Sequence, residues 1–202
     1  MTISFEDKVV IVTGAGGGLG RSHAIEFAKR GAKVVVNDLG GEVDGSGGSS
    51  ESANNVVKEI TDSGGIAIPN GSSVTDDDGV KNMVDQTIDE FGRIDILINN
   101  AGILRDKSFS KMEIDDFTIV TDIHLMGSVK PTKMVWEIMK EQNYGRILVT
   151  TSSTGLYGNF GQTNYGAAKL GVVGFVNSLK LEGQKYNINC NVLCPVAYTR
   201  MT

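Results

Sequence analysis

The 202-residue chain has no long apolar run and no cluster of basic residues. Its apolar stretches fall short of the roughly 18 consecutive residues that a membrane-spanning helix needs, so we expect no span. The 19 Lys and Arg residues are scattered and outnumbered by 24 Asp and Glu, which gives a net charge of -5. This balance argues against nucleic acid or an anionic membrane surface as the main partner. The N-terminal residues lack the basic and apolar regions of a signal peptide, so we expect a protein that is not secreted.

Cysteine is scarce as well, since only Cys190 and Cys194 occur, four residues apart in a predicted strand. That spacing places their α-carbons too far apart for a disulfide. Two thiols alone cannot supply a structural zinc site. We therefore predict two buried, reduced thiols and a reducing compartment. No set of His, Cys and Asp residues has the spacing of metal ligands, so we predict no metal.

Glycine, in contrast, is abundant at 26 residues against three prolines, and its clusters separate the apolar segments. Short runs rich in β-branched residues predict strands at 8–13, 33–37, 66–68, 94–99, 146–151 and 188–194. Helical periodicity predicts helices at 19–30, 50–63, 77–91, 113–142 and 163–185. Gly127 and Pro131 could bend or interrupt the fourth of these helices.

This alternation of strands and helices predicts an α/β fold with a doubly wound, Rossmann-type parallel sheet in three layers. In such a fold the ligand lies outside the carboxyl ends of the strands. The glycine-rich stretch 40–50 could pass for an interdomain linker. Because the same alternation runs on both sides of it, we interpret it as a long surface loop within one domain over 1–202.

The glycines of Thr13-Gly-Ala-Gly-Gly-Gly-Leu-Gly20 follow the first predicted strand and open the first helix. A glycine turn at this place lets the backbone approach a pyrophosphate at the positive N-terminus of a helix. We therefore predict cofactor contacts at Gly14, Gly18 and Gly20. Two alternatives stay open, a purely structural turn and a phosphate loop of NTP-hydrolysing enzymes. The second would need Gly-Lys-Ser/Thr where this chain has Gly20-Arg21-Ser22.

Asp38 ends the second predicted strand about twenty residues past the glycines, where an acid can bind ribose hydroxyls. A carboxylate would repel a 2′-phosphate and so favours NAD over NADP, unless Asp38 is an ordinary acid at a strand end. Arg21 keeps the choice open, because an arginine near the glycine loop could accommodate a phosphate. Ser73-Val74 and Asn99-Asn-Ala-Gly102 follow the next two strands and could edge the same cleft or form plain turns.

Tyr165 and Lys169 lie one turn apart on the helix predicted after the fifth strand. An ammonium group there favours the phenolate and lowers a tyrosine pKa that is otherwise about 10. A phenol tuned in this way can exchange a proton with an alcohol oxygen. Ser152 ends the strand and could hold a substrate oxygen, although Ser153 competes for this role with a side chain expected on the opposite side. Alone, the Tyr–Lys spacing is a weak signal.

Together these motifs resemble the short-chain dehydrogenase/reductase family over nearly the whole chain. The resemblance implies that Tyr165 is the general acid/base, that Lys169 binds the nicotinamide ribose and lowers the tyrosine pKa, and that Ser152 orients the substrate. The thirteen-residue gap to the tyrosine selects Ser152 over Ser153. The implied cofactor contacts are Gly14, Gly18, Leu19, Gly20, Asp38, Ser73, Val74, Asn100, Ala101, Gly102, Tyr165, Lys169 and Pro195.

The segments 37–41, 100–106 and 157–162 are similar to the (3R)-hydroxyacyl-CoA dehydrogenase unit of peroxisomal multifunctional enzymes of type 2. This likeness implies NAD-dependent oxidation of a (3R)-3-hydroxyacyl-CoA to the 3-ketoacyl-CoA in fatty-acid β-oxidation. It also implies a homodimer formed through the helices near 113–142 and 163–185. The location would be peroxisomal in a eukaryote and cytoplasmic in a bacterium. Alternatives are a 3-ketoacyl-thioester reductase, another short-chain alcohol or steroid dehydrogenase, and a non-catalytic NAD-binding or dimerisation module.

Three departures from the family pattern stand out. The usual Asn-x-x-Gly after the fourth strand is His124-Leu-Met-Gly127, where His124 either holds the water that the asparagine would hold or fills the space through its backbone. The usual Pro-Gly after the sixth strand is Pro195-Val196. Relatives continue beyond the position of Thr202 through a substrate-covering segment and a seventh strand. We therefore expect a chain cut short at its C-terminus that lacks both.

Overall fold

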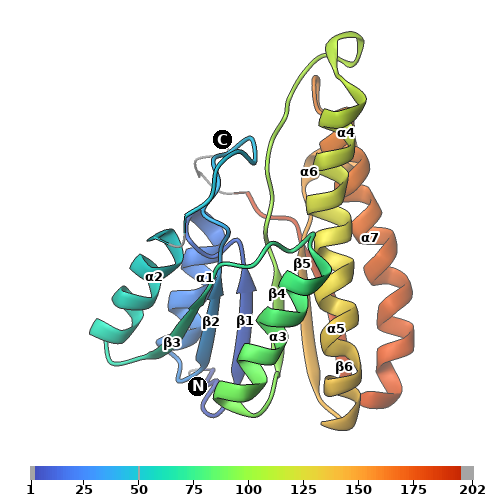
Figure 1. Cartoon of the computed structure of the whole chain (residues 1–202). Coiled ribbons are helices and arrows are strands. Elements are labelled where there is room, and N and C mark those ends of the chain that lie inside the picture. Colours follow the sequence, from blue (N-terminus) through green and yellow to red (C-terminus); the bar gives the residue numbers. More distant parts are fainter. Residues whose placement is uncertain (1–2, 50, 197–202) are drawn as a thin grey trace.

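The computed structural model describes residues 3–49 and 51–196. At its centre is a parallel sheet of six strands in the order β3-β2-β1-β4-β5-β6 (Figure 1). The strands are β1 (Val9–Thr13), β2 (Lys33–Asn37), β3 (Ile66–Asn70), β4 (Ile96–Asn99), β5 (Gly145–Thr150) and β6 (Ile188–Leu193). The order reverses between β1 and β4, so the crevice that such a sheet offers to a ligand lies at the carboxyl ends of these two strands.

Helices cover both faces of this sheet and complete the three layers that the sequence predicts (Figure 1). The helices are α1 (Gly18–Ala28), α2 (Glu51–Asp62), α3 (Asp77–Phe91), α4 (Ile114–Thr121), α5 (Gly127–Glu141), α6 (Ser153–Tyr157) and α7 (Thr163–Gly183). Three short turns of other helix types are η1 (Phe109–Lys111), η2 (Asp122–Met126) and η3 (Gln184–Tyr186). Helices α1 and α2 pack on one face, and α3, α5 and α7 pack on the other. The predicted doubly wound α/β fold is confirmed.

β1 shows how the sequence produces this arrangement. All five of its residues are buried. Val10 and Val12 pack in the core that includes α1 and α2, whereas Ile11 packs in the core that includes α3, α5 and α7. Successive side chains of a strand point to opposite faces. A continuous apolar run is therefore what a parallel strand covered on both faces requires.

The helix predicted over 113–142 consists of three pieces. α4 ends at Thr121, a π-helical turn η2 follows, and α5 begins at Gly127. Pro131 lies inside α5 without ending it. The break therefore falls at η2, a kind of turn that is often found inside helices at functional sites. His124 is the buried residue of this turn.

Two further elements differ from the sequence prediction. The sequence does not predict α6, because its five residues are too few to show helical periodicity. β3 extends beyond the predicted 66–68 to Asn70 and includes Pro69. Proline is tolerated there because β3 is an edge strand. The long loop predicted at 40–50 joins β2 to α2 without regular structure in its described part, residues 40–49.

The two cysteines have different surroundings. Cys190 is buried in β6, as predicted, and burial raises the pKa of its thiol to about 11. Cys194 is exposed, so the prediction of two buried thiols is wrong for this residue. The strand β6 ends at Leu193, and the chain leaves the core there. The chain end at 200–202, on which the prediction of an absent C-terminal strand and covering segment depends, lies outside the described residues.

Candidate active site

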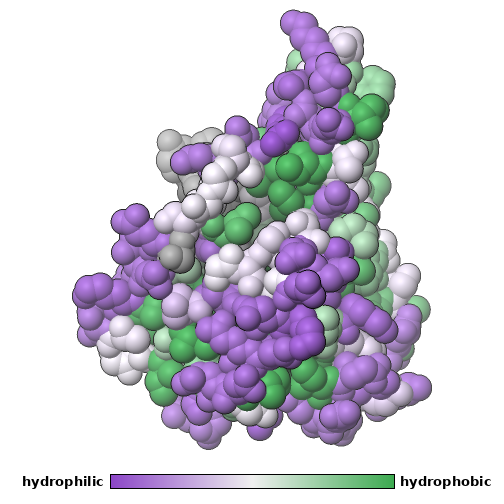
Figure 2. Space-filling model, viewed as in Figure 1, coloured by the Kyte–Doolittle hydropathy of each residue, from purple (hydrophilic) through white to green (hydrophobic). Residues whose placement is uncertain are grey.

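The carboxyl ends of the central strands open into one cavity of about 570 Å³. It reaches from the glycine turn after β1 to Ser152, Tyr165 and Lys169 beside β5. Figure 2 shows hydrophobic surface gathered in the hollow above the sheet, where Ile103, Leu104 and others line the cavity. Apart from Gly20, all the site residues predicted from the sequence line this cavity. The structure therefore brings together residues from both halves of the chain.

The glycine turn forms one end of the cavity. Gly14 and Gly18 have positive φ values of 62° and 53°, which favour glycine. Gly17 caps α1 without a side-chain hydrogen bond, and the first turn of α1 holds no acidic residue. The backbone N–H groups at this helix start are therefore available to an anion. Gly20 lies outside the cavity lining, and a Cβ there would come within 2.1 Å of the Gly14 oxygen, so its role is close packing beneath the turn.

Asp38 anchors three parts of the chain at the edge of the cavity. Its carboxylate accepts hydrogen bonds from the backbone N–H groups of Gly16 at 2.7 Å and Gly40 at 2.6 Å. It also accepts one from the Ser52 hydroxyl at 3.3 Å. Arg21, which leaves the choice between NAD and NADP open in the sequence, is 2.5 Å from the Glu59 carboxylate of α2. That arginine is therefore paired with a carboxylate and does not line the cavity.

The segment after β4 is clamped to the glycine turn. The Thr13 hydroxyl accepts hydrogen bonds from the backbone N–H groups of Asn100 and Ala101 at 3.0 and 3.1 Å. The Asn100 amide donates in return to the backbone oxygens of Thr13 and Gly14, both at 3.1 Å. These bonds explain why an amide and small residues stand in this motif, which sequence alone could not distinguish from a plain turn.

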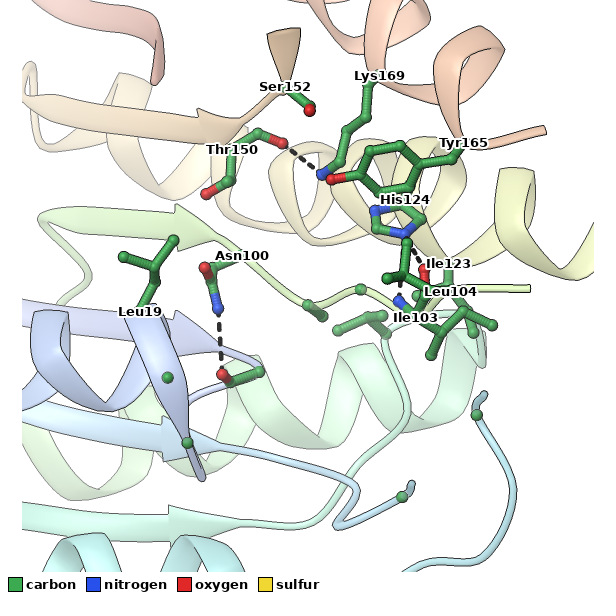
Figure 3. A pocket seen from close by; sticks show the side chains of 18 of the residues that line it. Leu19, Asn100, Ile103, Leu104, Ile123, His124, Thr150, Ser152, Tyr165 and Lys169 are labelled. Carbon is green, nitrogen blue, oxygen red and sulfur yellow. Dashed lines mark hydrogen bonds between the residues drawn. The ribbon is translucent and has the colours of Figure 1, made fainter. Parts of the chain in front are cut away.

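Ser152, Tyr165 and Lys169 converge at the other end of the cavity (Figure 3). Ser152 caps α6 by accepting a hydrogen bond from the Thr154 backbone N–H at 3.2 Å, and its hydroxyl lies in the same cavity as Tyr165. The Lys169 side chain is buried, and its Nζ donates to the Thr150 backbone oxygen at 2.6 Å. The same Nζ lies 5.5 Å from the centroid of the Tyr165 ring. A serine hydroxyl, a phenol and an amine thus surround one region where an alcohol or carbonyl oxygen could bind.

The pKa values of this group are shifted by burial. Burial raises the pKa of Tyr165 above its usual value of 10, while the nearby Ser152 hydroxyl acts in the opposite direction. Burial also lowers the pKa of Lys169 to about 7. Lys169 is not among the groups that shift the pKa of Tyr165 here, so the lowering of the tyrosine pKa by Lys169 stays a prediction.

His124 enters the site from the π-helical turn η2. Its Nε2 lies 2.8 Å from the backbone oxygen and 3.2 Å from the backbone nitrogen of Ile103. Its ring packs edge-to-face on Tyr165, with 5.0 Å between the centroids. Gly102 leaves room for this ring, because a Cβ there would come within 2.3 Å of the histidine Cε1. Burial, assisted by the charge of Lys169, holds the pKa of His124 well below its usual 6.5, so the ring is neutral.

Several residues of the site are not identified by the sequence patterns. Asn159 and Gln162 line the cavity, and the Gln162 amide is fixed by hydrogen bonds with Asp106 at 2.7 Å and Thr154 at 3.1 Å. Asn164 is buried beside Tyr165. Asn159 and Gln162 belong to the segment 157–162 that carries the resemblance, but the sequence assigns no role to them or to Asn164.

Neither a metal centre nor a membrane span is found among the described residues. No group of three or more His, Cys, Asp and Glu residues in 3–49 and 51–196 is placed to hold a metal ion. Within these same ranges, no helix has the length and apolar character that crossing a membrane requires.

The sheet is doubly wound and carries an uncapped glycine turn. A serine, a tyrosine and a lysine lie in the same cavity as this turn. Together these features define an oxidoreductase of the dinucleotide-binding class. The chain belongs to the short chain dehydrogenase family, whose model matches residues 8–202. It is 53% identical over 197 residues to a short-chain type dehydrogenase/reductase of Mycobacterium tuberculosis, across 98% of this chain and 69% of that protein.

The chain is also 54% identical over 202 residues to peroxisomal multifunctional enzyme A of Dictyostelium discoideum. That alignment covers 100% of this chain but 45% of the enzyme, so the chain spans less than half the length of this relative. Among solved structures, a 7α-hydroxysteroid dehydrogenase complexed with NADH and 7-oxo glycochenodeoxycholic acid matches with a TM-score of 0.90 and 31% identity. The match covers 98% of this chain and 74% of that one.

Proposed function

We propose that the protein oxidises a (3R)-3-hydroxyacyl-CoA to the 3-ketoacyl-CoA with NAD, and that Tyr165 takes the alcohol proton. The observation that carries the proposal is the single cavity that joins Ser152, Tyr165 and Lys169 to Asp38 and the uncapped start of α1. The likeness to a peroxisomal multifunctional enzyme supports the choice of an acyl-CoA substrate. It also supports a peroxisomal location if the protein is eukaryotic, and we propose a cytoplasmic location if it is bacterial.

The residues of the cavity fit a nicotinamide dinucleotide. The glycine turn would hold the pyrophosphate, since Gly17 caps α1, lines the cavity and has no atom within 4 Å of the place where a Cβ would stand. Asp38 would hold the adenosine ribose. Its carboxylate already accepts three hydrogen bonds, and a carboxylate has about four lone-pair sites, so one acceptor position remains for a ribose hydroxyl. Because Arg21 is paired with Glu59, it does not offset the charge of Asp38, which favours NAD over NADP.

The proposed mechanism assigns each catalytic side chain one task. Ser152 and Tyr165 bind the C3 hydroxyl of the substrate. Tyr165 accepts the hydroxyl proton while the C3 hydrogen leaves as hydride, and the C–O bond becomes a carbonyl. When bound, NAD supplies the hydride acceptor and a positively charged nicotinamide ring, which favours the phenolate of a nearby tyrosine. Lys169 would bind the nicotinamide ribose.

A homodimer is part of the proposal. The helices near 113–142 and 163–185 would form the contact, and they carry exposed apolar side chains at Met126, Met134, Leu170 and Leu181. Burying such side chains between two copies is favourable. Sedimentation of the purified protein would test this, and a monomer at micromolar concentration would contradict it.

The reaction is tested by NADH formation at 340 nm from (3R)- and (3S)-3-hydroxyacyl-CoA. We expect turnover with the (3R) substrate and a loss of about 100-fold or more in kcat for Tyr165→Phe, which removes the proton acceptor. Tyr186→Phe is the matched control, because Tyr186 lies in η3 and keeps its ring contacts with lysine side chains. A loss of less than tenfold in Tyr165→Phe would remove the phenol from the mechanism. Preference for NADPH and a 3-ketoacyl thioester would indicate a reductase instead.

A further inference from the structure

Tyr165 is contacted by two buried side chains that come from different elements, and both bind the same backbone segment, Ile103–Arg105. His124 lies on η2 and contacts the tyrosine ring. Asn164 lies at the start of α7 and contacts the tyrosine backbone. Figure 3 shows the imidazole between the Tyr165 ring and the strand-end segment that carries Ile103. The catalytic tyrosine is therefore linked to this segment from two sides.

The His124 side chain is closely packed. It is 2% exposed, and its ring occupies the space that a Cβ at Gly102 would need. Nε2 faces both the N–H and the oxygen of Ile103, and a neutral ring can pair with only one of them at a time. The shorter contact, 2.8 Å to the oxygen, favours a protonated Nε2 that donates to Ile103. Nδ1 is then an acceptor, and no hydrogen-bond partner in the described residues faces it.

Asn164 is fixed even more completely. Its side chain is 0% exposed. The amide donates to the backbone oxygens of Arg105 at 3.1 Å and Asp116 at 3.2 Å, and its oxygen is 2.8 Å from the Tyr165 backbone N–H. Removing the side chain would leave these buried backbone groups unpaired, which is costly. Asn164 therefore sets where α7 begins relative to the segment after β4.

The segment itself is held in place by its neighbours. The Leu104 N–H donates to the Val43 backbone oxygen at 2.9 Å. The Arg105 side chain donates to the Asp44 backbone oxygen at 2.9 Å and contacts the Asp116 carboxylate at 3.2 Å. A segment bound on both sides is a suitable fixed point for a side chain that must be placed within a fraction of an ångström.

We propose that His124 and Asn164 are positioning residues that hold Tyr165 to the Ile103–Arg105 segment, His124 through the ring and Asn164 through the backbone. This inference rests on the proposed function, in which Tyr165 exchanges the proton. Neither residue exchanges a proton itself. Both act through the placement of the phenol relative to Ser152 and the reacting oxygen.

The test compares His124→Phe, Asn164→Ala and the double variant with wild type. The matched control is Asn177→Ala, because Asn177 lies on the same helix and its exposed side chain accepts a hydrogen bond from Lys180. We expect each single variant to lower kcat about 10- to 100-fold while the NADH dissociation constant changes less than about threefold. The double variant should lose less than the product of the two single losses, because both residues serve one placement.

A purely structural role would not move the protonation of the phenol, so the pH dependence is the second measurement. The groups that face Tyr165 are Ser152, Lys169, His124, Asp106 and Cys194. We expect the pH limb that belongs to Tyr165 to shift by about half a pH unit or more in both single variants and not in the control. Values of kcat within threefold of wild type in both variants would overturn the proposal, as would a loss of cofactor affinity in parallel with kcat.

Two outcomes need a separate measurement, namely a variant that does not fold and a wild-type protein that shows no turnover. If Asn164→Ala does not fold, as judged by circular dichroism without cofactor, His124→Phe alone decides, because it replaces one ring by another. If wild type shows no turnover with any 3-hydroxyacyl thioester, the proposed function fails. The placement of Tyr165 is then measured by ultraviolet titration of its phenol, as the difference between each protein and the same protein with Tyr165→Phe. An unshifted titration in both variants would contradict the positioning role on its own.

Discussion

The Nζ of Lys169 donates a hydrogen bond of 2.6 Å to the backbone oxygen of Thr150, and the lysine side chain is only 4% exposed. A neutral carbonyl does not offset the desolvation of an ammonium group, so burial lowers the pKa of Lys169 to about 7. The Nζ of this lysine lies 5.5 Å from the ring centroid of Tyr165, the residue that we propose exchanges the proton.

Lys169→Met should make the folded protein more stable and less active. As pH falls from 10.5 toward 7, the unfolded chain binds a proton at Lys169 that the folded chain does not, so wild type loses stability over this range. We expect the variant to gain about 1–3 kcal/mol in the free energy of unfolding at pH 7, and less at pH 10. Urea unfolding at the two pH values measures this. An equal difference at both would show that charge burial is not the cause.

Asp38→Asn should weaken NADH binding and reduce the discrimination against NADPH. The change removes the charge that repels a 2′-phosphate while keeping an acceptor for Gly16 or Gly40. We expect the NADH dissociation constant to rise about tenfold or more and the ratio of the two cofactor affinities to fall by a larger factor. Fluorescence titration with NADH and with NADPH measures both dissociation constants and so gives their ratio.

The control for the Asp38 variant is Asp62→Asn, which also removes one negative charge but does so on α2, outside the cavity lining, where Asp62 pairs with Lys58. It should leave the NADH affinity within about twofold of wild type, because an exposed charge at a distance from the ligand is screened by solvent. An unchanged ratio of NADH to NADPH affinity in Asp38→Asn would remove Asp38 from cofactor selection.

Gly102→Ala should destabilise the fold through its collision with His124. The new Cβ would lie 2.3 Å from the histidine Cε1, and the buried ring has no free direction to move. We expect a loss of about 1–3 kcal/mol, as for other overpacked sites. His124→Ala should rescue part of it in the double variant, because it removes the atom that is struck. Thermal unfolding of wild type, the two single variants and the double variant forms a double-mutant cycle. Additive losses of stability would show that the two positions do not interact.

Cys194 should react with a maleimide much faster than Cys190. The first is exposed, while the second is buried and has a thiol pKa of about 11. Because the thiolate is the reactive form, we expect a rate difference of at least about 100-fold in the native protein. Mass spectrometry of digested samples identifies the modified residue. Cys194→Ser should remove the fast phase, and comparable labelling of both cysteines would contradict the described burial.

The sequence is sufficient to predict the parallel sheet and the place of its ligand site. β-branched runs such as that of β1 indicate strands covered on both faces, and the carboxyl ends of parallel strands share one edge. Residues as distant as Asp38 and Tyr165 can therefore be assigned to one cavity. Ser152 can be chosen over Ser153 because a fixed spacing to Tyr165 is available.

Other features depend on contacts that no spacing indicates. The pKa of Tyr165 follows from burial, which is a property of the folded chain. Arg21 is near the glycine turn in sequence, but its partner Glu59 lies on another helix. The π-helical turn that carries His124 has no periodicity of its own, and Asn164 is one of many asparagines until its three buried bonds are seen.

Within the described residues, β6 pairs with a neighbour on one side only, since β5 is its single partner and it ends the strand order. Its six residues, Ile-Asn-Cys-Asn-Val-Leu, include no charge and no proline, the two features that most often protect an edge strand. Wherever this edge stays uncovered, it offers a template on which another strand can add. Self-association through such an edge would rise with protein concentration, so solubility would limit what can be measured before catalysis does.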